Sequence, residues 1–335
     1  MKKIISLIII AAMLLTTVLG LASCTQKTPD TGLESSAIKI PVIGINQFGE
    51  HPSLDNCRTG FLKGLEESGL VEGVDFEIDY QNAGFDTTTA GQIAQTFVSK
   101  KVSLMCGIAT PSATACFAAS DGTDIPTVFN AITDPAAAML TEGNVTGVSD
   151  KLPVTAQLDL IRKIQPDATK IGIIYTASEP NSVSAIAEYK AAAADYGFEI
   201  VDISISEQSQ VTQAVDTLIS REVDCFSNLT DNTVVGVLAS ILEKTNEAGI
   251  PVYGSEVEQV KIGCVASAGI DYYQLGINCG KIAAKILKGE AEAKDIQFET
   301  VSDYAIYINS EAAEALGITI PTTISENAIE SGNQE

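Results

Sequence analysis

The chain has 335 residues, a formal net charge of −23 and 45% hydrophobic residues. The acidic excess, without any cluster of Lys or Arg, argues against a basic face for binding DNA, RNA or anionic lipid. About 300 residues follow the apolar N-terminal segment, which is more than one hydrophobic core usually holds, so we expect two domains.

The N-terminus has the pattern of a secretory signal. Lys2 and Lys3 precede an apolar run from Ile4 to Leu19, and small residues follow before Cys24. This run is shorter than the ~20 apolar residues of a membrane-spanning helix. Residues 21–24 (LASC) resemble the lipobox of bacterial lipoproteins, which implies cleavage after residue 23 and lipidation of Cys24. An ordinary signal with a chance cysteine is the alternative.

The segment after the cysteine is expected to be a tether. Residues 25–37 (TQKTPDTGLESSA) are rich in Thr, Ser, Pro and Gly, and no apolar period runs through them. Such a composition cannot offset its ordering entropy and stays flexible. We therefore expect residues 24–37 to link an anchor to a globular part that begins near residue 38.

Strand-like and helix-like segments alternate through the first half of the globular part. Pro52 suits a first helical turn and Gly69 a helix end. The expected strands are apolar throughout, which indicates a parallel sheet covered on both faces. We expect strands over 38–48, 74–80, 103–109 and 125–132, and helices over 52–69, 88–101 and 112–119.

The same order recurs in the second half. The segment that begins at Phe97 (FVSKKVSLMCGIATPSATA) matches the one that begins at Leu218 (LISREVDCFSNLTDNTVVG), about 120 residues later. The sequence therefore predicts an α/β fold with two similar doubly wound parallel-sheet lobes joined by a hinge. The second set of expected strands covers 170–176, 199–205, 224–229 and 250–254, and the helices cover 181–196, 210–220 and 232–248.

The C-terminal third is expected to return to both lobes. A helix over 272–288 would join the first lobe, and a strand over 304–308 the second. Ligands of open parallel sheets sit beyond the carboxyl ends of the strands, so both lobes can face one cleft that closes by hinge motion. We assign 38–150 plus about 273–300 to lobe 1, 151–272 plus about 301–321 to lobe 2, and 322–335 to a polar tail, with crossings near 149–153, 271–273 and 299–303.

Several segments carry a family resemblance over about residues 38 to 320. The chain resembles two-lobed periplasmic binding proteins of the type I fold, and more narrowly the ABC substrate-binding lipoproteins associated with tryptophan and tyrosine uptake. The segments are IGINQFGEHPSLD (43–55), GIATPSATA (107–115), ITDPAAAML (132–140), VTGVSD (145–150) and YTASEPNS (175–182).

The resemblance implies an extracytoplasmic solute-binding component of an ABC importer, held at the cell membrane by its lipid anchor. Its partners would be a small ligand, an aromatic amino acid by resemblance alone, and an ABC permease. We expect a monomer with no cofactor, no metal and no nucleic-acid partner. A lipoprotein that senses another amino acid or a nucleoside-like solute is an alternative with the same fold.

An amino acid needs donors for its carboxylate. Thr110, Ser112 and the amide of Ala113 lie at a strand-to-helix junction, where helix N-terminal amides favour an anion. Ala131 and Thr133 follow the next strand as further candidates. The resemblance implies that the carboxylate docks in this lobe, whereas helix capping is the alternative role of Thr110 and Ser112.

The ammonium needs an acid, and four acids at strand ends qualify: Asp134, Asp231, Glu256 and Asp271. Asp231 has an alternative role as the N-cap of the helix that begins at Asn232. Other candidate ligand contacts share a position just after a first strand or at a helix start. They are Gln47, Phe48, Glu179, Asn181, Ser182, Asn232 and Thr233.

Aromatic side chains near strand ends could form the walls of the site. Such residues are also common in cores, so both roles stay open. The candidates are Phe48, Phe129, Tyr175, Tyr253 and Tyr272.

Enzymatic signatures are absent from the sequence, and we expect no catalytic residue. His51 is the one histidine, no Gly-x-Ser-x-Gly elbow is present, and no His pair or Cys-x-x-Cys set could hold zinc. Paired carboxylates leave a carboxylate-dependent hydrolase as the remaining enzymatic alternative. We expect His51 either to line the hinge-side loop or to satisfy the backbone groups of a helix start. The six cysteines besides Cys24 are expected to be mostly free, buried thiols, with disulfide pairing left open.

Overall fold

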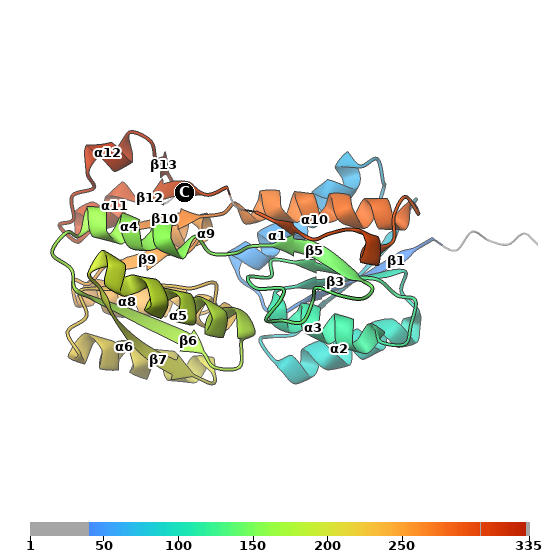
Figure 1. Ribbon diagram of the computed structural model, residues 1–335, viewed down its shortest axis with the longest axis horizontal. Coiled ribbons are helices and arrows are strands. Elements are labelled where there is room, and N and C mark those ends of the chain that lie inside the picture. The colour runs from blue at the N-terminus through green and yellow to red at the C-terminus, as the bar shows by residue number, and fades with distance from the viewer. Residues whose placement is uncertain (1–39, 302, 333–335) are drawn as a thin grey trace, which may run out of the picture. The chain divides into compact units, whose positions relative to one another are not determined.

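A computed structural model describes residues 40–301 and 303–332. The expected signal peptide, Cys24 and tether lie outside these residues. The described residues belong to one compact unit that contains two sheets, each covered by helices (Figure 1). Within the described ranges, no helix has the length and apolar character needed to cross a membrane.

The first sheet has six parallel strands in the order β2-β1-β3-β4-β5-β11. The order β2-β1-β3-β4-β5 is a doubly wound arrangement, in which ligands bind at the carboxyl ends of the strands. The strands are β1 (Val42–Gln47), β2 (Glu77–Asn82), β3 (Leu104–Ile108), β4 (Thr127–Asn130), β5 (Val145–Ser149) and β11 (Glu299–Thr300).

Four helices cover this sheet, and together with it they form lobe 1. Helices α1 (Pro52–Glu67) and α10 (Tyr272–Leu287) lie on one face, and α2 (Thr87–Lys100) and α3 (Thr110–Ser120) lie on the other (Figure 1). The buried side chains of Ile43, Phe61 and Phe97 belong to one core around the sheet. The apolar strands are therefore buried on both faces, as the sequence predicted.

Glycines bring α1 and α10 unusually close together. A Cβ atom on Gly64 would lie 2.2 Å from the carbonyl oxygen of Ile277, and one on Gly280 would lie 2.1 Å from that of Phe61. Because real Cβ atoms essentially never approach so closely, only glycine permits this backbone contact. The contact fixes the first turn of α1 relative to that of α10, and both turns lie at the carboxyl ends of the strands.

The second sheet repeats the first in the order β7-β6-β8-β9-β10, then adds β12 and β13. All its pairs are parallel except β10 with β12. The strands are β6 (Lys170–Thr176), β7 (Glu199–Ile205), β8 (Cys225–Ser227), β9 (Val252–Gly254), β10 (Ala266–Gly269), β12 (Ala305–Ile308) and β13 (Ile329–Glu330).

This sheet and its helices form lobe 2. Helix α4 packs on α5, and α6 packs on α8. The helices are α4 (Val154–Ile164), α5 (Pro180–Ala192), α6 (Val211–Ser220), α7 (Asn232–Val235), α8 (Leu238–Glu247), α9 (Val257–Ile262), α11 (Ser310–Ala315) and α12 (Thr322–Ser325). Short 3-10 turns η2, η3 and η4 cover Ala193–Tyr196, Gln208–Gln210 and Ala293–Asp295.

The two similar doubly wound lobes confirm the predicted fold class, whereas three local expectations differ. The single helix expected over 232–248 is broken into α7 and α8 at Gly236 and Val237. Residues 322–330 form α12 and β13 on the second sheet, and Ile324 is buried, so this stretch is not a plain polar tail. Strand β5 and helix α9 were not predicted from the sequence. The six cysteines of the described part are buried free thiols.

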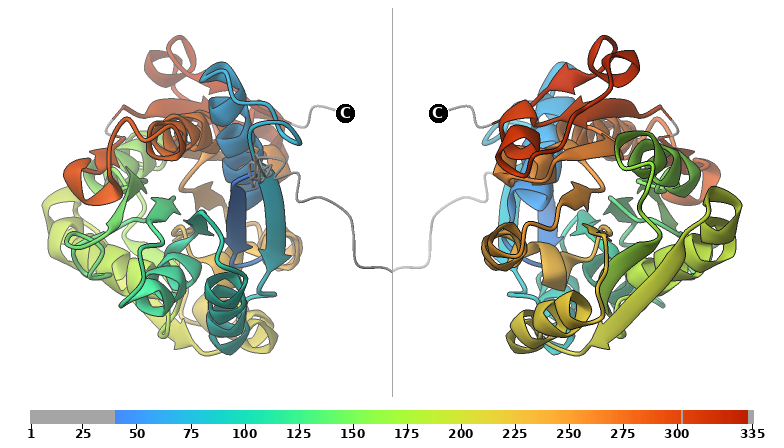
Figure 2. Two further views of the ribbon diagram at one scale, coloured as in Figure 1. Left: turned by 90° about the vertical axis from the view of Figure 1, so that its right-hand side faces the viewer. Right: turned by 90° about the vertical axis from the view of Figure 1, so that its left-hand side faces the viewer.

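The two lobes are viewed from their ends in Figure 2. In both views helices surround the strands on either side, which is the layered arrangement that a buried parallel sheet requires. The carboxyl ends of the parallel strands in both lobes carry the loops that form the site described next.

Candidate functional site

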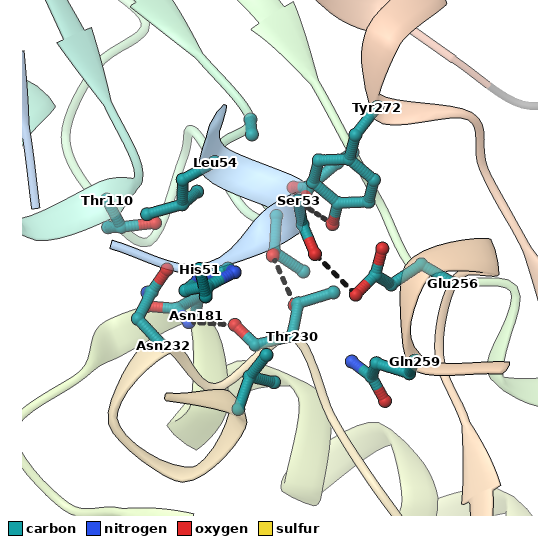
Figure 3. A pocket seen from close by; sticks show the side chains of 14 residues that line it. His51, Ser53, Leu54, Thr110, Asn181, Thr230, Asn232, Glu256, Gln259 and Tyr272 are labelled. Carbon is teal, nitrogen blue, oxygen red and sulfur yellow. Dashed lines mark hydrogen bonds between the residues drawn. The ribbon is translucent and has the colours of Figure 1, made fainter. Parts of the chain in front are cut away.

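A cavity lies between the strand ends of the two lobes (Figure 3). Lobe 1 contributes residues that follow β1, β3, β4 and β5, together with the first residue of α10. Lobe 2 contributes residues that follow β6, β8 and β9. The lining residues are His51, Ser53, Leu54, Thr110, Ala131, Thr133, Asp150, Asn181, Thr230, Asn232, Val235, Glu256, Gln259 and Tyr272.

A buried acid, Asp150, follows β5 and faces the cavity. It is 2% exposed, and its Oδ2 accepts a hydrogen bond from the hydroxyl of Tyr272. Its Oδ1 has no hydrogen-bond partner among the described residues. Burial raises the pKa of Asp150, although the hydroxyls of Tyr272 and Thr133 act in the opposite direction. A cationic group in the cavity would therefore find a buried acid with a free oxygen.

A second acidic group, Glu256, is the N-cap residue of α9. Its Oε1 accepts a hydrogen bond of 2.6 Å from the hydroxyl of Ser53, which belongs to α1 of the other lobe. Beside it, Glu258 Oε1 accepts one of 2.6 Å from the amide of Asn56. Neither Oε2 atom has a partner in the described part of the chain. Burial, and then the neighbouring Glu258 carboxyl, raise the pKa of Glu256 well above its usual value.

The start of α1 supplies the opposite polarity. Ser53 and Leu54 are in its first turn, where backbone N–H groups have no acceptor within the helix and carry partial positive charge. Thr110 is at the equivalent start of α3. The cavity thus faces helix N-termini from lobe 1 and unpartnered carboxyl oxygens from Asp150 and Glu256.

The N-cap of α1 is His51, whose side chain makes no cap bond. It is 8% exposed, and neither ring nitrogen has a hydrogen-bond partner within the described ranges. Burial lowers the pKa of His51 to about 4, although Asn232 and Asp55 act in the opposite direction. At neutral pH the ring is therefore uncharged and presents one donor and one acceptor.

A buried carboxylate organises the lobe 2 side of the cavity. Glu179 accepts hydrogen bonds from the backbone N–H groups of Asn232 and Thr233, both at 3.0 Å, and from their side chains at 2.6 and 2.7 Å. Asn181 Nδ2 also reaches Glu179, at 3.2 Å. With its oxygens occupied by these donors, Glu179 stands behind the lining and fixes the positions of Asn181 and Asn232.

Several hydrogen bonds join the two lobes around the cavity. The hydroxyls of Thr133 and Thr230 are 3.1 Å apart, and Ser184 donates to Asp134 at 2.6 Å. With the Ser53–Glu256 bond, these contacts hold the carboxyl ends of the two sheets together across the site. The described conformation is therefore one in which the lobes are closed on the cavity.

Six of the residues proposed from sequence line the cavity: Thr110, Ala131, Thr133, Asn181, Asn232 and Glu256. Tyr272, one of the aromatic wall candidates, lines it as well. Phe48 and Ala113 are buried in core clusters, as are Phe129 and Tyr253, and Tyr175 packs against one.

The polar candidates outside the lining have structural partners. Ser112 donates to Asn46 at 3.1 Å, Gln47 donates to Gly49 and Asp55, and Ser182 is buried behind Asn181. Asp271 is an exposed N-cap that accepts from the amides of Tyr273 and Gln274, so its place is the start of α10 and not the cavity.

Asp231 acts in the way its alternative role predicted. It caps α7 by accepting from the amide of Val234 at 2.9 Å, and it also accepts from the amide and hydroxyl of Thr176. Burial and the nearby Glu179 raise the pKa of Asp231 to about 7. Its hydrogen bonds link the end of β6 to the start of α7, behind the lining.

Seven lining residues were not placed in the site from the sequence: His51, Ser53, Leu54, Asp150, Thr230, Val235 and Gln259. Asp150 was missed because β5 is a five-residue strand, VTGVS, that contains a glycine and that no pattern predicted. Ser53 and Leu54 follow Pro52, and this predicted helix start was the available signal. No cluster of His, Cys, Asp or Glu suited to a metal ion occurs among residues 40–301 and 303–332.

Comparison with known proteins places these features in context. The family model for ABC transporter substrate binding protein matches residues 42–331. The tyrosine-binding protein of Clostridioides difficile (strain R20291) is 38% identical over 328 residues, which cover 94% of this chain and 92% of that protein.

Two solved structures differ in their state. The ABC domain from Streptococcus pneumonia in complex with L-Trp is 33% identical, covers 87% of this chain and 99% of its own, and has a TM-score of 0.83. A ligand-free, open substrate binding protein with adhesive properties from Clostridium difficile is 36% identical, with 88% and 100% coverage and a TM-score of 0.65. At similar identity, the described conformation matches the complexed protein more closely than the open one.

Proposed function

This chain belongs to the family of ABC transporter substrate-binding proteins, and we propose that it captures an aromatic amino acid and presents it to an ABC permease. Proteins of this family are extracytoplasmic. The Leu-Ala-Ser-Cys sequence at 21–24 supports the further proposal that the mature protein is held at the membrane by lipid on Cys24.

The observation that carries the proposal is the opposed polarity of the cavity. An amino acid is a zwitterion, and Asp150 Oδ1 offers an acid for its ammonium that has no partner among the described residues. The N-terminal amides of α1 at Ser53 and Leu54, together with Thr110, offer donors for its carboxylate. A ligand with both charges could pair with Asp150 Oδ1 and with these donors at the same time.

The remaining lining favours a large apolar side chain. Apolar surface of the lining comes from Leu54, Ala131 and Val235 and from the ring of Tyr272. The names of two related proteins point the same way, since one is called tyrosine-binding and another was solved with L-Trp. An aromatic amino acid fits both the charge pattern and these walls.

We also propose that capture proceeds by hinge closure. We infer that the chain passes between the lobes near 149–153, 271–273 and 299–303, because the strands of each consecutive pair β5 and β6, β10 and β11, and β11 and β12 belong to different sheets. The bond from Ser53 to Glu256 and the pair Thr133–Thr230 need the lobes closed, so a ligand that touches both lobes would shift the population toward this state.

We propose that the protein performs no catalysis. Among the described residues, the ring nitrogens of His51 bond to no serine, cysteine or carboxylate, so the single histidine has no partner with which to activate a nucleophile.

Thermal unfolding in the presence of each of the twenty amino acids tests the proposed function. A ligand at ~100 times its dissociation constant adds about 2.7 kcal/mol to the free energy of unfolding, so the midpoint should rise by several degrees. We expect shifts with tyrosine, tryptophan or phenylalanine and none with aspartate or lysine. Folded, ligand-free protein that shifts with no aromatic amino acid would overturn the proposal.

A further inference from the structure

We propose that His51 and Asn181 form a subsite for a phenol hydroxyl, so that the site selects tyrosine over phenylalanine. This inference rests on the proposed function, because it concerns the side chain of the aromatic amino acid. The subsite would make the protein selective among aromatic amino acids, whereas the charge pattern at Asp150 and α1 recognises only the ammonium and carboxylate that all of them share.

The side-chain amide of Asn181 has a fixed orientation. Its Nδ2 lies 2.9 Å from the carbonyl oxygen of Thr230 and 3.2 Å from Glu179 Oε2, two atoms that can only accept hydrogen bonds. Its Oδ1 must therefore be the atom that is buried without a partner in the described part of the chain. Asn181 is 3% exposed and lines the cavity, so it offers the ligand an acceptor and no donor.

His51 complements this acceptor from lobe 1. Its ring is uncharged at neutral pH, and although the side chain of Asn232 lies against it, neither nitrogen makes a hydrogen bond to a described residue. One face of the ring is parallel to Phe85, with 7° between the planes and 6.4 Å between the centroids. The neutral ring adds a donor to the acceptor of Asn181, and neither group carries a net charge.

These groups lie apart from the acids that would hold the ammonium. In Figure 3, His51, Asn181 and Asn232 are on one side of the cavity, and Glu256 and Tyr272, whose hydroxyl donates to Asp150, are on the other. The carboxylate of a ligand is disfavoured near Asn181, because the unpaired Oδ1 and the buried Glu179 both repel an anion. The uncharged tip of the ligand's side chain is the part that fits there.

A phenol hydroxyl matches both groups, since it can donate to Asn181 Oδ1 and accept from His51. An indole N–H can only donate, and the ring of phenylalanine can do neither. A site whose buried polar groups pair with a ligand hydroxyl rejects the analogue that lacks it, because those groups are left unpaired. The expected order of affinity is tyrosine, then tryptophan, then phenylalanine.

Calorimetric titration of the wild type, His51→Phe and His51→Gln with tyrosine and phenylalanine tests the proposal. The wild type should bind tyrosine at least ~100-fold more tightly than phenylalanine. His51→Phe keeps the ring shape and should reduce this ratio at least ~10-fold, whereas His51→Gln keeps a donor and should preserve most of it. A ratio that is unchanged in His51→Phe, or equally reduced in both variants, would overturn the subsite.

A ligand series on the wild type gives a result that does not depend on the folding of variants. O-Methyltyrosine can accept a hydrogen bond but cannot donate one, so it should lose affinity relative to tyrosine as the Asn181 acceptor is left unpaired. Equal affinity for tyrosine, O-methyltyrosine and phenylalanine would contradict the subsite while leaving aromatic capture intact. Failure of all three to bind would instead contradict the proposed function.

Discussion

At the scale of single residues, we expect recognition of the ligand's charge to depend on Asp150. It is buried with one oxygen free, and its pKa is raised by burial, with no cation of the described residues beside it. Asp150→Asn keeps the shape and an acceptor for Tyr272 but removes the charge. The dissociation constant for tyrosine should rise at least ~30-fold, corresponding to about 2 kcal/mol for loss of one partner of a buried charge pair.

A matched control is available at Asp271, an exposed N-cap outside the cavity. Asn caps helices as well as Asp, so Asp271→Asn should leave both stability and tyrosine affinity unchanged. Titration calorimetry on the two variants separates the roles. Wild-type affinity in Asp150→Asn would show that the ammonium binds elsewhere.

How far single residues could be predicted depended on whether their strand was recognised. Thr133 and Glu256 were proposed because each follows an apolar strand that the sequence reveals. Asp150 follows a short strand with a glycine, so its position at a strand end was hidden. For Asp231 the sequence revealed the position at a strand end but not the role, because both a helix cap and a ligand contact were possible. The hydrogen bonds from the backbone N–H groups of Thr176 and Val234 place Asp231 behind the lining.

At the scale of elements, the close packing of α1 against α10 positions two parts of the site, because both helices begin at the cavity. Gly64→Ala would push a Cβ into the backbone of α10 at Ile277. Overpacking of this kind costs about 1–3 kcal/mol, and here a carbonyl rather than a flexible side chain is in the way. Urea unfolding should show a loss of that size.

The control for this change is Gly91, a helical glycine in α2 where an added Cβ atom would meet open space. Gly91→Ala should raise the free energy of unfolding by about 0.5–1 kcal/mol, because alanine loses less backbone entropy on folding. If both substitutions had the same sign, the glycine contact between α1 and α10 would not be a close-packing requirement.

We expect the contact of α9 with α1 to make closure sensitive to pH. Glu256 and Glu258 meet only uncharged donors, Ser53 and Asn56, when the lobes are closed. Besides Ser53 and Asn56, the titratable and polar groups around the pair are Cys57, Asp150, Gln259, Cys264, Tyr272 and Tyr307. No cation of the described residues is among these, so closing should favour a protonated carboxyl.

The direction of the pH effect on ligand affinity follows from the raised pKa of Glu256 in the closed form. Below the ordinary Glu pKa of about 4.3, Glu256 is protonated in both the open and the closed form of the protein. Above that pH, Glu256 must take up a proton when the lobes close. The affinity for tyrosine should therefore fall as the pH rises through the pKa of Glu256 in the closed form. Calorimetry in buffers of different ionisation enthalpy should detect proton uptake. Glu258→Gln should reduce the proton uptake on tyrosine binding, whereas Glu50→Gln, at an exposed position, should not. Equal proton uptake in the wild type and both variants would refute the role of Glu256 in this pH dependence.

Helices and strands could be predicted where the hydrophobic periodicity agreed with the residues that start and end such elements. The bounds of β6 and β7 match the expected 170–176 and 199–205. The expected helix over 232–248 failed at Gly236, where the chain turns from α7 into α8. Short elements such as α9, with six residues, offer too few turns for a helical period to appear.

At the scale of the whole molecule, the duplicated strand order was visible in the sequence, because apolar runs recur in phase across both halves. The cavity was not visible in the sequence. Its lining joins segments such as 51–54 and 256–259, which are about 200 residues apart and meet only across the two lobes. Sequence can place residues at strand ends, but closure decides which of them share a cavity.

The central claim, that this cavity holds an aromatic amino acid, is tested most directly by a crystal structure of the protein grown with saturating L-tyrosine. We predict the ammonium within hydrogen-bond distance of Asp150 Oδ1, the carboxylate at the first turn of α1, and the ring between Leu54 and Val235. Tyrosine bound outside this cavity, or turned so that its carboxylate meets Asn181, would contradict it.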